Sequence, residues 1–196
     1  MSKSVISVIV LLLILERLAE TYLPDKVKKR GKVSANWLFY SLLISGILVY
    51  VSGIAEYVFV VKKINTAVSI VGLLLVTIKI MLKFWSIKTL GKLWSIQIEI
   101  RKDHELIKGG PYRYVRHPSY LSTIIEVFGG LLVVNAYYSI ILTCFLYVPL
   151  IIIRIVLEER QLLIKFGERY IEYSCEVPML LPFKMFIRKR SENDVL

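Results

Sequence analysis

The side chains best suited to chemistry gather between residues 104 and 120, which include both histidines of the chain. Pro118 is typical of the first turn of a helix, where a missing N–H costs nothing. Arg116 and His117 then stand beside unpaired backbone donors and the positive end of the helix dipole, which predicts an anion site. The alternative is a juxtamembrane belt that only anchors the helix. The full cluster is His104, Tyr112, Arg113, Tyr114, Arg116, His117 and Tyr120.

A second group lies further along the chain, at the end of an apolar run. Arg154 and Glu158 are four residues apart and share one helical face, whereas Glu159 points about 100° away. A charge within an apolar run is costly and usually marks a substrate path or a paired partner. The alternative for Arg154 is an internal salt bridge with Glu158. Lys79 and Glu126 also fall inside apolar runs, and we expect them to snorkel or to be paired, with no chemical role.

Several familiar site signatures are missing from the sequence. It contains no G-x-G-x-x-G after a strand, no Walker A sequence, no H-E-x-x-H and no G-x-S-x-G. Two cysteines are too few for a disulfide scaffold or a thiolate metal site, and no metal is expected. A nucleotide-like cofactor would therefore bind without a Rossmann domain.

The elements that must position these residues are membrane helices. The 196 residues are 56% hydrophobic, with a mean hydropathy of +0.63, which is too apolar for a soluble domain of this size. We expect an all-α integral membrane protein, one membrane domain over residues 1–196, with about five helices. We read the first of these helices as retained in the protein, not as a cleaved signal peptide. The predicted spans are residues 4–23, 35–61, 66–85, 119–134 and 137–157.

The positive charges support this topology. With these spans, twenty lysines and arginines fall on one side of the membrane and three on the other. The bias places the C-terminus in the cytoplasm, together with two long polar segments, 86–118 and 158–196. The net charge of +11 is read as a membrane feature, with no nucleic-acid partner expected. Only Asn135 and Ala136 separate the last two spans, which predicts a tight antiparallel connection.

The two cytoplasmic segments carry patterns of their own. Residues 96–100 alternate isoleucine with polar residues, and a Gly-Gly-Pro turn follows at 109–111, which favours a short β-hairpin. Residues 158–173 have apolar side chains at helical spacing and predict an amphipathic extension of the last helix. Pro178 and Pro182 then exclude a continuous helix beyond it.

These residues together resemble the isoprenylcysteine carboxyl methyltransferase family. The resemblance covers residues 104–182, and the family often has glycine where this chain has Ser122. The motifs that carry it are Arg116-His117-Pro118-Ser119-Tyr120, then Glu158-Glu159, then Phe166-Gly167-Glu168-Arg169-Tyr170-Ile171-Glu172-Tyr173, and the exit from Pro178 to Pro182.

The resemblance implies methyl transfer from S-adenosylmethionine to the carboxylate of a lipophilic, prenylcysteine-like substrate at the cytoplasmic face, with S-adenosylhomocysteine as product. Membrane lipids are the other expected partners. The membrane would be the cell membrane in a prokaryote and the endoplasmic reticulum in a eukaryote. Arg154 would meet the substrate carboxylate. Arg116 is added to the predicted cofactor site because it stands beside the N-terminus of the helix that begins at Pro118. By resemblance the cytoplasmic segments 86–118 and 158–196 would form the cofactor site. The cofactor would be held by Gln97, His104, Leu106, Ile107, Tyr112, His117, Tyr120 and Glu158.

Three other functions fit parts of the sequence. A membrane reductase that uses NADPH on a sterol-type double bond could carry the R-H-P-x-Y segment alone. A phospholipid N-methyltransferase would share the cofactor but methylate an amine. A small transporter would account for charges within spans, although no inverted repeat is evident.

Overall fold

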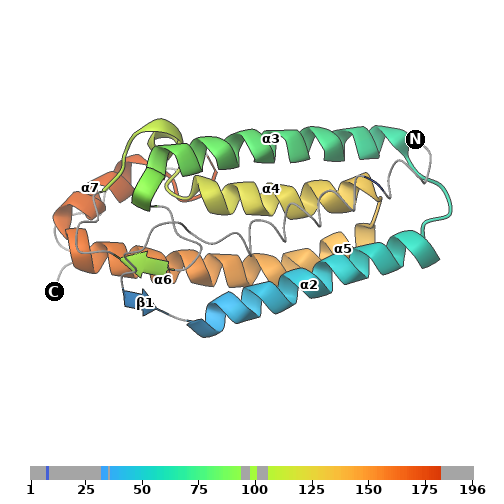
Figure 1. The fold of residues 1–196 in the computed structure, drawn as a ribbon, viewed down its shortest axis with the longest axis horizontal. Helices are drawn as coiled ribbons and strands as arrows, with labels where there is room; N and C mark the ends of the chain where they lie inside the picture. Colours follow the sequence, from blue (N-terminus) through green and yellow to red (C-terminus); the bar gives the residue numbers. More distant parts are fainter. Residues whose placement is uncertain (1–7, 9–31, 35, 94–97, 101–105, 182–196) are drawn as a thin grey trace.

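A computed structural model describes residues 8, 32–34, 36–93, 98–100 and 106–181 (Figure 1). Apart from Val8, the helix expected over residues 4–23 lies outside the described residues, as do Gln97 and His104. The described part is predominantly helical, as expected.

Helices of the expected lengths make up the bundle. Figure 1 shows α3 and α4 side by side, with α2 running along α5 and α6. Among the described residues, three helical stretches are long and apolar enough to cross a membrane, and α4 is a shorter apolar helix. The protein is a membrane protein, but the count of five spans is not confirmed. The bounds are α2 Asn36–Phe59, α3 Thr66–Leu90, α4 Pro118–Val133, α5 Tyr137–Leu142, the π-helical turn η3 Thr143–Tyr147 and α6 Val148–Phe166.

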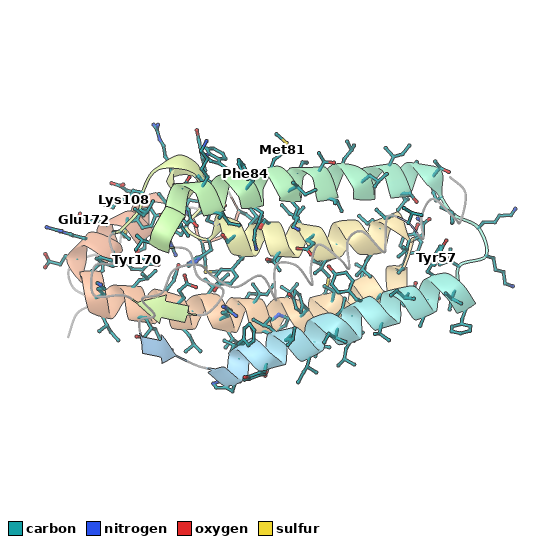
Figure 2. All side chains as sticks on the ribbon, viewed as in Figure 1. Tyr57, Met81, Phe84, Lys108, Tyr170 and Glu172 are labelled. Carbon is teal, nitrogen blue, oxygen red and sulfur yellow. The ribbon has the colours of Figure 1, made fainter. Side chains whose placement is uncertain are left out.

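Helix α3 shows how the bundle differs from that of a soluble protein. Its buried positions are small or polar, including Ser69 and Gly72, whereas its apolar side chains face outward. Met81 and Phe84 are more than two-thirds exposed and project away from the other helices (Figure 2). Outward apolar side chains and close inner helix contacts suit a lipid environment.

Charges inside the bundle are paired. The Lys79 Nζ atom lies 3.3 Å from Glu126 Oε2, with both side chains almost fully buried. The Tyr50 hydroxyl donates a hydrogen bond of 3.2 Å to Glu126 Oε1. This cluster joins α2, α3 and α4, so Lys79 and Glu126 are paired residues.

Glu56 of α2 ties that helix to the start of α5. Its carboxylate accepts from the backbone N–H groups of Tyr138, at 3.0 Å, and Ser139, at 2.8 Å, and from the Ser139 hydroxyl. These are donors of a helix N-terminus, which a carboxylate stabilises.

The tight turn between α4 and α5 is confirmed. Asn135 adopts φ +58°, a left-handed conformation that asparagine tolerates. Its side chain donates to Ser69 Oγ at 2.9 Å and accepts from the Asn65 N–H at 2.7 Å. The turn is thereby fixed to the start of α3.

Two expectations for the polar segments need correction. A strand is present at β2 Ile98–Ile100, but the β-hairpin is not confirmed, because β2 pairs antiparallel with β1 Lys32–Ser34. The 109–111 turn instead leads into the 3-10 helix η2 Gly110–Arg113, and another, η1 Gly91–Leu93, follows α3.

The single amphipathic extension over residues 158–173 was also wrong, because the helix breaks. Helix α6 ends at Phe166, Gly167 adopts φ +54°, and a separate helix α7 Glu168–Glu176 follows. Only glycine adopts this conformation without strain. Helix α7 ends before Pro178, as predicted.

Helices α3 and α4 approach so closely that a glycine is required. A Cβ atom on Gly72 would lie 2.6 Å from the Val133 backbone nitrogen and 2.7 Å from the Gly129 carbonyl oxygen. Neither backbone atom can move away cheaply. On α2, by contrast, a Cβ on Gly46 would lie an ordinary 3.5 Å from the Tyr147 ring.

We therefore predict that Gly72→Ala destabilises the protein by about 1–3 kcal/mol, the usual effect of overpacking. Gly46→Ala is the matched control and should be neutral or stabilise by up to about 1 kcal/mol, because alanine favours helix. Thermal unfolding in detergent measures both. Equal stability of the two variants would contradict the close approach of α3 and α4.

Candidate functional site

The N-terminus of α4 is held by the chain that follows α7. The Arg116 N–H donates to the Pro178 carbonyl at 2.9 Å, and the His117 N–H donates to the Met179 carbonyl at 3.1 Å. The backbone N–H groups of Arg116 and His117 are therefore both paired with this segment. The C-terminal segment thus lies beside the first turn of α4.

Glu159 occupies the predicted anion site. Its Oε1 atom accepts from Arg116 Nε at 2.8 Å and contacts His117 Nε2 at 3.0 Å. Because an ionised carboxylate only accepts, the His117 Nε2 atom carries the proton in this contact. Glu159 has no role in the sequence-based predictions, although its place in the Glu158-Glu159 motif was the available signal.

Arg116 also binds two backbone carbonyls. Its Nη1 atom donates to Ser174 O at 2.7 Å and to Val177 O at 2.6 Å. One guanidinium therefore joins α4, α6 and the end of α7.

Tyr120 connects the second predicted group. Its hydroxyl donates to Glu158 Oε2 at 2.5 Å and accepts from Arg154 Nε at 2.8 Å. The guanidinium carbon of Arg154 lies 5.5 Å from the centre of the Tyr120 ring, and Arg154 is buried. A tyrosine hydroxyl thus lies between the two charges.

A cluster of tyrosines closes the end of the bundle that α7 covers. The Tyr173 hydroxyl donates to the Tyr112 carbonyl at 2.6 Å, which fixes η2 against α7. Tyr170 and Tyr173 pack together, with their ring centroids 6.2 Å apart, and Leu106 packs against them. Figure 2 shows Tyr170, Lys108 and Glu172 at this end, and Lys108 Nζ lies 5.7 Å from the Tyr173 ring centroid.

Burial raises the pKa of all three tyrosines. The pKa of Tyr173 rises to about 12, and that of Tyr112 and of Tyr170 rises further above its ordinary value. Like a free tyrosine, each hydroxyl is protonated at neutral pH and can donate. Within the described residues, the buried Tyr170 hydroxyl has no hydrogen-bond partner.

The structure thus brings most of the predicted residues to one end of the bundle. Ile107 is half-buried in the loop beside Leu106, and Ser122, where the family often has glycine, is buried and donates to the Ser119 carbonyl. The residues gathered here from η2, the loop before α4, α4 itself and α6 are Tyr112, Arg116, His117, Tyr120, Arg154 and Glu158.

Comparison with known proteins agrees with this arrangement. The model of the isoprenylcysteine carboxyl methyltransferase (ICMT) family matches residues 70–164, which hold α3, η2, α4 and most of α6. An uncharacterized protein of Bacillus subtilis, YpbQ, is 28% identical over 159 residues, which are 79% of this chain and 94% of that protein. The protein-S-isoprenylcysteine O-methyltransferase of Schizosaccharomyces pombe is 36% identical, over 41% of this chain and 34% of the relative. That of Saccharomyces cerevisiae is 32% identical, over 59% and 49%.

A solved structure is also similar. It is that of the eukaryotic intramembrane Ras methyltransferase ICMT, with a TM-score of 0.52 and 26% identity over 72% of this chain and 52% of that chain. The chain therefore spans about half or less of the length of these methyltransferases. The matched residues include the helices that carry Tyr120, Arg154 and Glu158. The chain is thus similar to the isoprenylcysteine carboxyl methyltransferase family, in sequence over residues 70–164 and in fold.

Proposed function

We propose that the protein transfers a methyl group from S-adenosylmethionine to the carboxylate of a lipophilic, prenylcysteine-like substrate. The observation that carries this proposal is the Arg154–Tyr120–Glu158 network, which places a cation and an anion side by side in an apolar bundle. The names of the yeast relatives support the reaction. We place the site at the cytoplasmic face of a multi-pass protein, on the side that receives most lysines and arginines.

The residues present fit the cofactor. S-Adenosylmethionine supplies a methyl group on a sulfonium centre, and it also carries an ammonium, a carboxylate and an adenine. Glu158 suits a cationic group, the rings of Tyr112 and Tyr120 suit the adenine or the sulfonium, and the orphan hydroxyl of Tyr170 marks an unused donor nearby. The proposed binding residues are Gln97, His104, Leu106, Ile107, Tyr112, His117, Tyr120 and Glu158.

Arg116 acts differently in this proposal from the sequence-based expectation. We expected it to hold the cofactor carboxylate with His117, but Glu159 and two carbonyls bind its guanidinium. We assign Arg116 a positioning role, because it fixes the C-terminal segment and, through Glu159, the ring of His117.

Arg154 performs the task that the acceptor requires. A carboxylate is already ionised at neutral pH, so attack on a methyl carbon needs no general base. The buried guanidinium has only to hold the carboxylate in line, and such positioning in a site without bulk water can supply most of the acceleration. The prenyl chain would remain in lipid, while the carboxylate would reach Arg154 through a lateral opening between helices.

Similarity to the isoprenylcysteine carboxyl methyltransferase family favours this reaction over the NADPH-dependent reductase and the small transporter. A phospholipid N-methyltransferase would use the same cofactor, but an arginine suits a carboxylate better than an ammonium headgroup. Acceptor assays distinguish these directly.

The first prediction concerns cofactor binding. Isothermal titration of the purified protein should detect S-adenosylhomocysteine and no NADPH. Glu158→Gln should weaken binding by about 10- to 100-fold, the loss of one charge-assisted hydrogen bond. Glu172→Gln, an exposed change on α7, is the control and should bind normally. Binding of NADPH in place of S-adenosylhomocysteine would refute the proposal.

The second prediction concerns the substrate. Arg154→Ala should lower methylation of a prenylcysteine analogue by about 100-fold or more, because the acceptor loses its only positioned cation in the proposed mechanism. S-Adenosylhomocysteine affinity should change far less. Arg160→Ala, exposed on the same helix, is the control. Unchanged methylation by Arg154→Ala would exclude its role.

The third prediction concerns Glu159. Glu159→Ala leaves Arg116 and His117 without their carboxylate and should destabilise the protein by about 1–3 kcal/mol in thermal unfolding. Glu159→Gln keeps an acceptor and should lose less.

A double-variant cycle then tests whether Arg116 acts through Glu159. Arg116→Ala combined with Glu159→Ala should cost less than the sum of the two single changes. Simple additivity would show that the Arg116–Glu159 contact contributes nothing to stability. Glu168→Ala, exposed on α7, is the surface control.

A further inference from the structure

The last membrane helix contains a π-helical turn whose place is explained by Pro149. The turn, η3, covers Thr143–Tyr147, between α5 and α6, and Pro149 follows in the first turn of α6. In a regular α-helix the ring of Pro149 would clash with the carbonyl four residues earlier, that of Phe145. A π-turn bonds five residues back and so accommodates one extra residue at this point. Such turns are frequent at functional sites.

The extra residue keeps the buried side chains of this helix on one stripe. Thr143, Ile151 and Ile155 are at most 1% exposed. At 100° per residue, a regular helix would point Ile151 about 80° and Ile155 about 120° away from Thr143. Because the π-turn accommodates one extra residue, every later side chain is rotated back about the helix axis by about 100°. Ile151 and Ile155 then both point within about 20° of Thr143. The observed burial therefore depends on the π-turn.

The part of the helix before the turn is fixed independently. Ser139 of α5 accepts a hydrogen bond of 3.1 Å from Ser52 and binds the Glu56 carboxylate, and both partners belong to α2. This end therefore cannot rotate to compensate for a change further along.

The part after the turn carries the proposed site. Arg154 lies 2.8 Å from the Tyr120 hydroxyl and Glu158 lies 2.5 Å from it. A rotation of α6 by about 100° would move side-chain positions at the helix surface by about 8 Å. No hydrogen bond survives such a displacement.

We propose that Pro149 and the π-turn are positioning elements of the site. Together they set the angle at which α6 presents Arg154 and Glu158 to Tyr120. Their importance for methyl transfer rests on the proposed function, whereas the angle itself can be tested without it.

The test removes or adds one residue at the same place. Deletion of Phe145 combined with Pro149→Ala should give a regular α-helix with α6 at its present angle. Phe145 is 81% exposed, so little packing is lost. The matched variant inserts one alanine after Phe145, also with Pro149→Ala, and a single π-turn cannot absorb this second extra residue. Pro149→Ala alone is the reference.

We expect the deletion to keep S-adenosylhomocysteine affinity and methylation rate close to those of the reference. The insertion should lower the rate by about 100-fold or more, as expected for a misplaced catalytic group. The insertion should also weaken S-adenosylhomocysteine binding, because Glu158 is displaced together with Arg154. Combined with Arg154→Ala, the insertion should cost less rate than it does alone, because part of its effect acts through Arg154. A purely structural role would instead lower rate and thermal midpoint together in both variants.

The inference is overturned if the deletion variant loses activity as the insertion does, if it fails to fold while Pro149→Ala folds, or if the insertion is tolerated. Failure of the proposed function is a separate result. In that case the unaltered protein neither binds S-adenosylhomocysteine nor methylates the analogue, and thermal unfolding alone tests the helix angle. The deletion should then remain stable and the insertion should not.

Discussion

A charge inside an apolar helix bundle has to be paired, and the described structure is organised by the ways in which its charges meet that requirement. At the end of the bundle near the α4–α5 turn, the Glu56 carboxylate accepts hydrogen bonds from the first N–H groups of α5. Further along, Lys79 and Glu126 pair across α3 and α4. Each pair fixes two helices at a defined depth relative to each other, because sliding either helix would leave a buried charge alone at a cost of several kcal/mol. The bundle can therefore hold a site rigidly although lipid provides little hydrophobic force between helices.

At the opposite end the pairing depends on one hydroxyl group. Tyr120 donates to Glu158 and accepts from Arg154, so α4 and α6 are joined by a neutral group that satisfies a charge of each sign. A direct ion pair would direct Arg154 and Glu158 at each other. With the tyrosine between them, Glu158 binds the hydroxyl through Oε2 and Arg154 binds it through Nε. In the proposed function, these are the groups that would meet a cationic donor and an anionic acceptor.

The sequence predicted the helices well and their angles poorly. Apolar length is a local property, so the helices beginning near residues 36, 66, 118 and 137 could be located from the run of apolar residues alone. The tight turn at Asn135 was equally local. The partner of β2 lies before α2, more than sixty residues away, and no pattern within residues 86–118 could reveal it. The break at Gly167 was visible as a glycine, but helical periodicity continued across it and concealed the change of direction. Likewise, Pro149 is visible in the sequence, whereas the π-turn that accommodates it depends on packing along the whole helix.

The direction in which side chains point from α6 also explains why the role of Glu159 was missed and why Glu159 matters. Two adjacent residues on a helix point about 100° apart, so neighbouring carboxylates cannot serve one site in the same way. Glu158 faces Tyr120, whereas Glu159 faces Arg116 and His117. The anion that the α4 N-terminus attracts is thus supplied by the protein itself, and it orients the imidazole by fixing the proton on Nε2. One turn of α6 consequently carries the group proposed to bind the cofactor and the group that holds the neighbouring histidine in place. A rotation of α6 would disturb both, which makes the helix angle the property on which the geometry of the whole end of the bundle depends.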